Sequence, residues 1–465
     1  MHIRHHPDTV LGGSERRRQV EKKLLRKLDY RLTFLLLVYI MNCVDRSNLP
    51  TARLKGLEED LHLTGLQFNT LISILHVGYV LMQVPSNLFL DRLKRPSAYF
   101  SFCVFLWGLL SISTGHSYRG ALISRFFLGF SEAVFYPGVI FMLTRWYKRD
   151  ELGIRMAYFT CGASVSSIFD QLTASAIFAI IPDGKLGYAA WRWLFFIEGG
   201  LTFAMALVSL YMIPDFPTTP ASWLTAEEQV LAQRRMTENV CGAEHDLFKS
   251  IRWHGLVEAF ADWTVWWLAI SMTVLNASMS FGLYFPTLAA TMGYSPTITL
   301  LLCAPPWVLS IATSFIVTRH SDVTGDRFWH VTGPVSMGIV GFIIAASTMD
   351  TSIRYLSLFF MAQSQVSYMV VMAWVSNSML ESTSKRAVAL AIVNMIGVLG
   401  YIGGSYLWPA EWGPSYSKSF CCCILAFFIS LVMVLVYRLH LIRLNQEAEL
   451  KEHSLGLPKG FRYIT

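Results

Sequence analysis

The chain has 465 residues, of which 54% are hydrophobic and only 15% are charged. Soluble domains carry roughly 25% charged residues, and the apolar residues here gather in runs of about 20, the length that spans a bilayer. The composition therefore excludes an ordinary soluble protein and predicts an all-α protein that spans a lipid bilayer several times. The net charge of +7 does not indicate nucleic-acid binding, because the basic residues are concentrated beside the apolar runs.

The apolar runs predict twelve transmembrane helices in two groups of six. A basic tail (1–31) precedes the first group (32–213), a long loop (214–262) follows it, and the second group (263–440) ends in a C-terminal tail (441–465). We expect no cleavable signal peptide, because the first residues are polar and basic. The predicted spans are 32–54, 67–90, 97–115, 120–144, 152–181, 190–213, 263–289, 297–319, 328–349, 353–379, 386–408 and 417–440.

Lysine and arginine set the predicted orientation. With the N-terminus inside, 29 of them fall in the tails and the loops on that side, seven fall outside, and Arg46 and Arg125 lie within spans. The positive-inside rule then makes both termini cytosolic. The long loop is cytosolic too, and Thr225 and Glu228 predict a capping box in front of a surface helix over 229–239. We expect a monomer in the plasma membrane.

Charged cytosolic loops recur at matching places in the two groups of spans. Such repetition is typical of internally duplicated transporters, whose halves rock against each other around a central site. We therefore predict a cytosolic gate made of ion pairs. The candidate gating residues are Asp91, Arg92, Arg149, Glu151 and Arg155 in the first half and Asp322, Arg327, Glu381 and Arg386 in the second.

Away from their ends, spans 1 to 6 contain six aspartate, glutamate, lysine or arginine residues, whereas spans 7 to 12 contain none. Charges in a membrane are costly and are functional candidates by default. Arg125 and Glu132 share one face of span 4, about 10 Å apart, and Gly129 between them leaves room for a ligand or a neighbouring helix. From the rise per residue, all six residues lie about 8–18 Å below the outer end of their span. They are Asp45, Arg46, Arg125, Glu132, Asp170 and Glu198.

Two cations and four carboxyls share this layer, so full ionisation would leave a net charge of −2 in a medium of low dielectric constant. At least one carboxyl is therefore expected to carry a proton in part of a transport cycle. The candidates for proton coupling are Glu132, Asp170, Asp45 and Glu198. The two arginines could bind a carboxylate substrate through paired hydrogen bonds. The candidates for substrate binding are Arg46, Arg125, Asn48, Asn276, Tyr284 and Gln363.

Each of these residues also has a structural interpretation. Glu198 could pair with Arg192, and Asp170 could form a helix–helix hydrogen-bond pair with Gln171. Buried amides and hydroxyls in membrane helices are more often partners of neighbouring helices than ligand contacts.

The sequence predicts neither a metal site nor a catalytic site. The eight cysteines mostly fall inside apolar runs and show no metal-ligand spacing and no disulfide framework. No set of nucleophile and base and no nucleotide-binding loop is found. We therefore expect no enzymatic activity and no cofactor.

Several stretches over about 30–445 resemble the major facilitator superfamily, and more narrowly the fungal anion:cation symporter family of allantoate, nicotinate and pantothenate permeases. These stretches are Asp45-Arg46-Ser47-Asn48, Ala52-Arg53-Leu54-Lys55-Gly56-Leu57, Tyr79 with Pro85-Ser86-Asn87-Leu88, Arg125-Phe126-Phe127-Leu128-Gly129 with Glu132-Ala133 and Pro137-Gly138, Trp146-Tyr147 with Glu151-Leu152-Gly153 and Arg155, Trp191-Arg192-Trp193 with Glu198-Gly199, Met292-Gly293-Tyr294-Ser295 and Lys385-Arg386-Ala387-Val388-Ala389.

The resemblance implies two pseudo-symmetric bundles of six transmembrane helices and proton-driven uptake of a small organic anion by alternating access. Related vesicular organic-anion transporters use arginines in helices 1 and 4 for the substrate carboxylate and an acidic residue in helix 4 for coupling. The positions that match them here are Arg46, Arg125 and Glu132.

We predict a proton-coupled symporter that imports a carboxylate nutrient or vitamin. Two alternatives stay open. An exporter of an acidic secondary metabolite would have the same fold and would differ in the direction of transport. A nutrient receptor would bind without transporting, and a long cytosolic signalling tail would favour it, whereas both tails here are short.

Overall fold

The computed structural model describes residues 14–455 except Asp91, Lys94, 115–116, Asp183, 185–186, 240–255 and 380–382, and it also describes residues 462–464. This part of the chain folds into helices, of which eleven are long and apolar enough to cross a membrane. The prediction of an all-α membrane protein is confirmed. The eleven segments are Gln67–Leu90, Pro96–Ser113, Tyr118–Trp146, Glu151–Ile180, Ala190–Met212, Trp263–Ala290, Pro296–Thr324, Phe328–Ser347, Thr351–Ser378, Val388–Ser405 and Ser417–Ser454.

The remaining predicted span lies in α1 (Ser14–Arg53), a helix of 40 residues. Asn42, Asp45, Arg46 and Asn48 interrupt its apolar stretch and lower its hydropathy. Asn42, Asp45 and Asn48 are nevertheless fully buried. Burial is achieved because α1 packs against α8 (Gly162–Ile180) and α9 (Ala190–Met212).

Four predicted spans, each expected as one helix, are built from shorter helices in series. Span 4 breaks directly after Glu132, which is the last residue of α5. Discontinuous helices in transporters place side chains and backbone groups at a binding site near the middle of the membrane. The pieces are α5 (Tyr118–Glu132) and α6 (Phe135–Trp146), α7 (Arg149–Thr160) and α8, α12 (Trp263–Met279) with η3 (Ser280–Tyr284) and α13 (Phe285–Ala290), and α16 (Thr351–Gln363) and α17 (Val366–Ser378).

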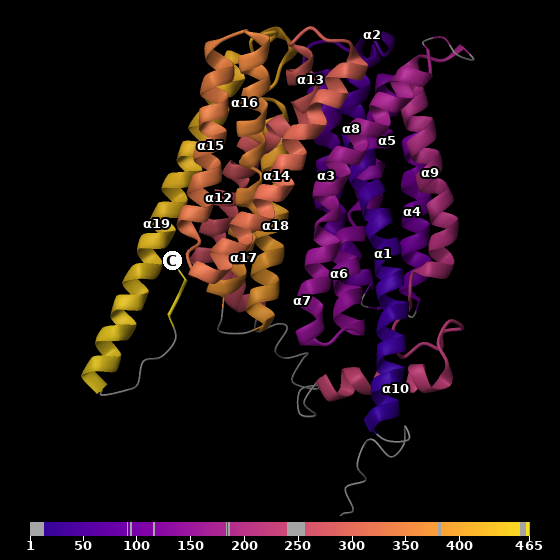
Figure 1. Cartoon of the computed structure of the whole chain (residues 1–465), viewed down its shortest axis with the longest axis vertical. Coiled ribbons are helices and arrows are strands. Elements are labelled where there is room, and N and C mark those ends of the chain that lie inside the picture. The colour runs from indigo at the N-terminus through magenta and orange to yellow at the C-terminus, as the bar shows by residue number, and fades with distance from the viewer. Residues whose placement is uncertain are drawn as a thin grey trace, which may run out of the picture.

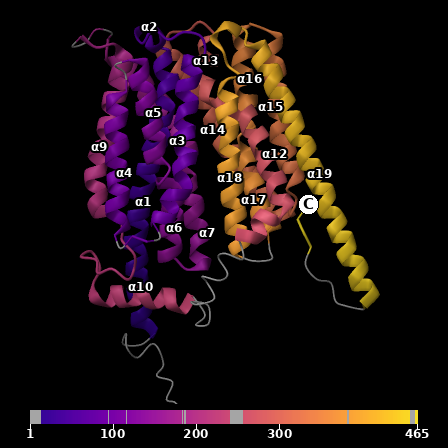
Figure 2. The same cartoon turned by 180° about the vertical axis from the view of Figure 1, so that it is seen from behind.

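The helices form two groups that stand side by side (Figures 1 and 2). The group from α1 to α9 is called the N-half here, and the group from α12 to α19 the C-half. Helix α10 (Ala226–Asn239) lies across one end of the N-half, and α2 (Leu57–Asp60) marks the opposite end (Figure 1). The other helices are α3 (Gln67–Leu90), α4 (Pro96–Ser113), α14 (Pro296–Thr324), α15 (Phe328–Ser347), α18 (Thr383–Ser405), η4 (Ala410–Trp412) and α19 (Ser417–Leu455).

The most extensive contacts between the halves run through two pairs of helices, and α1 also contacts η3 and α13. Helix α3 packs against α18, and α8 packs against α14. At the α2 end, Ser73 on α3 contacts Tyr406 just after α18 through their hydroxyls at 3.2 Å. Ser175 on α8 donates to the carbonyl oxygen of Thr297 on α14 at 2.9 Å. The α2 end is therefore closed by hydrogen bonds between the halves.

Glycine lets helices approach closely within each half. A Cβ on Gly129 of α5 would stand 1.9 Å from the carbonyl oxygen of Leu75 on α3. A Cβ on Gly400 of α18 would stand 2.1 Å from the carbonyl oxygen of Thr273 on α12. The space expected beside Gly129 is thus filled by a neighbouring helix.

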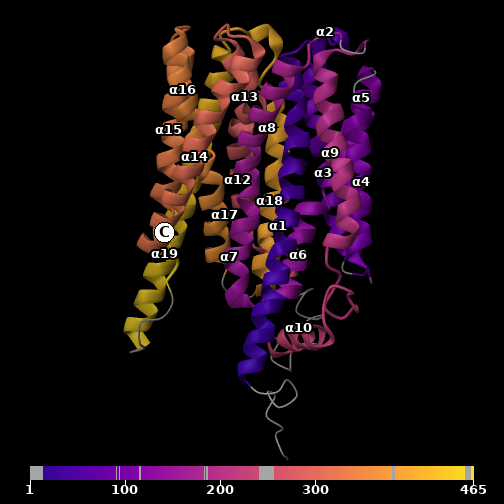
Figure 3. The ribbon, with the colours of Figure 1, turned by 45° about the vertical axis from the view of Figure 1, so that its right-hand side comes forward.

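Helix α10 begins at the predicted capping box. The backbone N–H of Glu228 donates to the Thr225 hydroxyl at 3.3 Å, and the backbone N–H of Thr225 donates to the Glu228 carboxylate at 2.9 Å. Figure 3 shows α10 beside the first turns of α1, and α19 running alongside α15. The long loop therefore carries an ordered helix that is docked on the N-half.

Candidate functional site

Arg46 and Glu132 form an ion pair inside the N-half. The Nε of Arg46 donates to Oε2 of Glu132 at 2.6 Å. The Glu132 side chain is fully buried, whereas 27% of the Arg46 side chain is exposed. The Tyr79 ring on α3 lies 4.5 Å from the guanidinium carbon of Arg46, within the range of a cation–π contact. Arg46 is thus held on two sides and accessible on another.

Arg125 points toward the backbone of α1. Its Nη1 donates to the carbonyl oxygens of Asp45 at 3.2 Å and Arg46 at 3.5 Å. The residue is 1% exposed, and its Nε and Nη2 meet no acceptor in the described part of the chain. The two arginines therefore differ: Arg46 pairs with a carboxylate and is partly exposed, and Arg125 is enclosed and keeps unused donors.

Asp45 joins three helices. Its carboxylate accepts hydrogen bonds from Ser111 of α4 and Thr202 of α9, both at 2.9 Å. The amide of Asn48, one turn further along α1, is 3.5 Å from the same carboxylate. Asp45 is fully buried. This arrangement matches the structural interpretation of a polar residue that fixes neighbouring helices.

Asp170 and Glu198 lie on α8 and α9, both of which pack against α1. The Gln171 amide donates to Asp170 at 3.0 Å. Both carboxyl oxygens of Glu198 are buried and have no hydrogen-bond partner in the described part of the chain. Glu198 does not pair with Arg192, which binds Asp60 at 2.9 Å instead. The six ionisable residues of the predicted layer therefore come together in the N-half, around α1.

Three candidate substrate residues of the C-half are occupied by neighbouring backbone. Tyr284 donates to the carbonyl oxygen of Ser405 at 2.8 Å. Asn276 donates to Gly397 at 2.9 Å, and Gln363 donates to Phe359 of its own helix at 3.1 Å. Each of the three is 1% exposed. In this conformation they act as packing partners, as the structural interpretation of buried polar groups predicts.

The candidate gating residues of the N-half pair with residues of α1 and α10. The Nε of Arg155 donates to the Asp29 carboxylate at 2.7 Å. Glu151 accepts from Arg235 of α10 at 2.6 Å, and Arg235 also lies 2.8 Å from Glu21 of α1. Arg92 is exposed after α3. Asp91 and the side chain of Arg149 lie outside the described residues.

Sequence reasoning missed Glu21, Asp29 and Arg235 as partners in this network. The first two sit in the N-terminal tail, which is read as a basic segment, and Arg235 sits in a linker helix. Acidic and basic residues recur at i, i+4 and i+7 in 15–29. This spacing indicates a charged helix face, but it does not identify the residues that the face contacts. The pairs depend on how α10 docks.

The candidate gating residues of the C-half are also paired locally. Arg327 binds the Asp322 carboxylate at 2.6 Å and the Ser321 hydroxyl at 2.9 Å, which ties the turn between α14 and α15. Arg386 donates to the carbonyl oxygen of Met379 at 3.0 Å. Glu381 lies outside the described residues. These bonds hold loops within the C-half.

A second contact ties α10 to α1. Lys27 binds the Glu228 carboxylate at 2.6 Å. Burial raises the pKa of Glu228, but the hydrogen bonds from Lys27 and the Thr225 backbone outweigh it, so the pKa ends below its ordinary value of 4.5. The carboxylate form of Glu228 is therefore the one that fastens α10.

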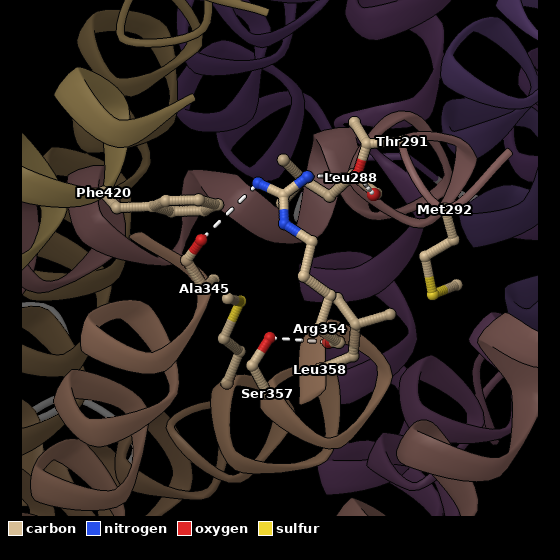
Figure 4. A pocket seen from close by; sticks show the side chains of 9 residues that line it. Leu288, Thr291, Met292, Ala345, Arg354, Ser357, Leu358 and Phe420 are labelled. Carbon is tan, nitrogen blue, oxygen red and sulfur yellow. Dashed lines mark hydrogen bonds between the residues drawn. The ribbon is translucent and has the colours of Figure 1, made fainter. Parts of the chain in front are cut away.

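A small pocket in the C-half surrounds Arg354 at the α2 end (Figure 4). The guanidinium donates to the Thr291 hydroxyl and to the carbonyl oxygen of Ser415, both at 2.7 Å. It also donates to the carbonyl oxygens of Pro414 at 3.2 Å and Ala345 at 3.5 Å. Because its donors are directed at the backbone around the pocket, Arg354 fastens the end of the C-half and is not a substrate candidate.

The arrangement of two helical halves around a layer of buried charge can be compared with known proteins. The family profile described as Major Facilitator Superfamily matches residues 35–405. The chain belongs to the Major Facilitator Superfamily. The narrower resemblance to fungal anion:cation symporters is not established by this match. The superfamily consists of membrane transporters, so this chain is a transporter-family integral membrane protein.

Related members of the superfamily cover most of the chain. The MFS-type transporter cnsO of Penicillium expansum is 32% identical, over 89% of this chain and 81% of that protein. An uncharacterized transporter of Schizosaccharomyces pombe is 30% identical, over 97% of this chain and 88% of that protein. A putative tartrate transporter of Agrobacterium vitis is 28% identical, over 83% of this chain and 85% of that protein.

Solved structures share the fold of this superfamily member. A bacterial homologue of the human lysosomal transporter Spinster, in an inward-facing conformation, superposes with a TM-score of 0.67 at 16% identity, over 88% of this chain and 95% of that chain. A D-xylose–proton symporter gives a TM-score of 0.63 at 16% identity, over 86% and 97%. These likenesses confirm the fold class of two six-helix bundles.

Proposed function

We propose that this superfamily member carries a small organic anion across the membrane by alternating access, in symport with protons. The substrate carboxylate binds the arginines of α1 and α5, and Glu132 carries the coupled proton. The α10 end is cytosolic under this proposal, in line with the excess of lysine and arginine there. The narrower assignment to the fungal anion:cation symporters belongs to the same proposal.

The ion pair between Arg46 and Glu132 is the observation that carries the proposal. The carboxylate occupies one nitrogen of the guanidinium, at 2.6 Å, while 27% of the Arg46 side chain stays exposed. A substrate carboxylate can therefore approach the same cation. Two carboxylates would then share one guanidinium in a poorly hydrated site, which favours a proton on Glu132 when substrate is bound. Linkage makes the coupling reciprocal: the proton also tightens substrate binding.

Two further observations support an anionic substrate. The Nε and Nη2 donors of Arg125 are buried without an acceptor in the described residues, and an incoming carboxylate would satisfy them. The relative in Agrobacterium vitis is named a putative tartrate transporter, and tartrate is a small dicarboxylate. A dicarboxylate suits a site that holds two arginines.

The test uses purified protein in proteoliposomes and a panel of labelled carboxylates, with tartrate among them. Glu132→Gln mimics the protonated carboxyl, so we expect it to exchange substrate in counterflow but to lose accumulation driven by a pH gradient. Glu59→Gln, at an exposed carboxyl of α2, is the control and should accumulate substrate like the unmodified protein. Accumulation against a gradient by Glu132→Gln would remove Glu132 from the coupling role.

A further inference from the structure

Three helices of the N-half enclose a set of polar side chains that lies apart from the Arg46–Glu132 pair. Asn48 and Thr51 come from α1, Asp170 and Gln171 from α8, and Glu198 from α9. Gln171 is 5% exposed and the other four are fully buried. This set is called the α1–α8–α9 oxygen cluster here.

The cluster contains six oxygen atoms that accept no hydrogen bond from the described part of the chain. Buried oxygens are normally satisfied, so a group of six in one place calls for a physical account. Three of the six atoms belong to neutral side chains, so the cluster is not only a group of acidic residues. The atoms are Oε1 and Oε2 of Glu198, Oδ1 of Asp170, Oδ1 of Asn48, Oγ1 of Thr51 and Oε1 of Gln171.

Helix geometry brings these oxygens together. Ser47 and Thr51 are four residues apart on one face of α1, and α1 packs against α8, which carries Asp170. Asn48 follows Ser47 on α1, which also packs against α9, the helix that carries Glu198. Gln171 follows Asp170 and bonds to its other oxygen at 3.0 Å. The three helices pack on one another, and each contributes at least one of the unpartnered oxygens.

The ionisable side chains of the cluster are all acidic. Asp170 and Glu198 are both acidic, and neither bonds to a lysine or an arginine in the described part of the chain. The neighbouring acid, Asp45, accepts hydrogen bonds from the Ser111 and Thr202 hydroxyls. The cluster thus combines two carboxyl groups with neutral side chains in a buried site, and such a site attracts positive charge.

We propose that the α1–α8–α9 oxygen cluster binds one dehydrated alkali cation of the size of Na+. Carboxylate, amide and hydroxyl oxygens are the ligands of hard cations. Mg2+ is disfavoured because it usually keeps several waters and is seldom bound by protein ligands alone. Among the described residues, no group of three or more histidine, cysteine or acidic side chains is placed to hold a metal, which argues against sites typical of transition metals. The inference goes beyond the proposed proton symport.

A bound cation would link substrate movement to a second ion. Helix α8 carries Asp170 and also packs against α14 of the C-half. A cation that ties α8 to α1 and α9 would therefore stabilise the arrangement in which α8 contacts α14. Arg46 shares α1 with the cluster, but its partner Glu132 lies on α5, outside the three helices of the cluster, so the two sites can be tested separately through Glu132.

The experiment measures thermal unfolding of the purified full chain in detergent, with NaCl replaced stepwise by choline chloride at constant ionic strength. A ligand that binds only the folded state raises Tm with its concentration, so we expect a saturable rise with Na+ and a smaller one with K+. Asp170→Asn and Glu198→Gln should each weaken the Na+ response about tenfold or more, because each removes a charged ligand. Thr51→Val, which keeps both charges, should weaken it by a smaller factor.

Glu132→Gln is the matched control, a buried carboxyl of the other site, and it should keep the full Na+ response even if it abolishes pH-driven transport. Binding of radioactive Na+ to the unmodified protein gives a second readout that does not depend on how well the variants fold. The proposal is overturned if Na+ and choline give the same Tm at every concentration. It is also overturned if acidification alone stabilises the protein through Asp170 and Glu198, since the cluster would then hold protons only.

Discussion

Asn69 and Tyr284 bind each other across the two halves, although they are 215 residues apart in the chain. The Asn69 amide donates to the Tyr284 hydroxyl at 2.9 Å, and that hydroxyl donates to the carbonyl oxygen of Ser405 at 2.8 Å. Asn69 also donates to Ser405 at 2.6 Å and to Trp408 at 3.2 Å. The Tyr284 side chain, a sequence candidate for substrate binding, therefore closes the α2 end in this conformation.

Tyr284→Phe should shift the protein toward conformations that are open at the α2 end. The change removes both hydrogen bonds of the hydroxyl and keeps the ring packed on Trp408, 5.8 Å away. Loss of about 1 kcal/mol of closing energy corresponds to a roughly fivefold change in the equilibrium. Spin-label distances between introduced cysteines at Glu59 and Glu411, in a cysteine-free background, measure the opening.

Thr313→Val is the control for that prediction, because the Thr313 hydroxyl bonds only to Leu309 of its own helix in an exposed position. It should leave the distance distribution unchanged. Identical distributions for Tyr284→Phe and the unmodified protein would show that the Asn69–Tyr284 contact does not hold the α2 end closed.

The two arginines should respond differently to replacement by lysine. Arg46→Lys keeps a cation beside Glu132 but loses the planar contact, so substrate binding should weaken about tenfold with little loss of Tm. Arg125→Lys should weaken binding and also cost about 1–3 kcal/mol of stability, because the α1 carbonyls lose a buried donor. Counterflow at varied substrate concentration measures the substrate affinity, and thermal unfolding measures Tm. A large drop in Tm for Arg46→Lys alone would contradict the assignment.

Gly129→Ala should destabilise the N-half strongly. The new methyl group would stand 1.9 Å from the Leu75 carbonyl oxygen, a backbone atom of α3, so one of the two helices must move. Overpacking of this kind costs about 1–3 kcal/mol or more. Gly200→Ala on α9, where a Cβ would meet nothing within 4 Å, should be neutral or stabilising by up to about 1 kcal/mol. Thermal unfolding of both variants measures the change in stability. Equal changes for Gly129→Ala and Gly200→Ala would contradict the close approach of α3 and α5.

The sequence predicts the fold better than the partners within it. Long apolar runs fix the spans, and depth along each helix puts Arg46 and Glu132 in one layer, because both follow from local periodicity. The partner of Glu132 does not follow from local periodicity. Arg46 and Arg125 lie at similar depths, and only the rotation of each helix about its axis decides which of them faces Glu132. Arg235 is harder still: its bonds to Glu21 and Glu151 depend on the docking of α10, for which a linker sequence carries no periodic signal.

Acid should release α10 from the N-half. The folded pKa of Glu228 lies below its ordinary 4.5, so the stability it contributes is present above that value and is lost as pH falls through the folded pKa. Lys27→Met removes the cation that lowers this pKa, and release should then occur at higher pH. Hydrogen exchange of residues 226–236, corrected for the intrinsic effect of pH, reports the release.

Arg16→Met gives the matched control, because Arg16 binds Glu227 of the same helix at 2.7 Å but both side chains are more than half exposed. Such surface pairs contribute little, so α10 should be released at the same pH as in the unmodified protein. Arg235→Met should loosen α10 even at neutral pH, since Glu21 and Glu151 would face each other without the buried cation between them. If Lys27→Met and Arg16→Met released α10 at the same pH, the Lys27–Glu228 pair would not be what fastens it.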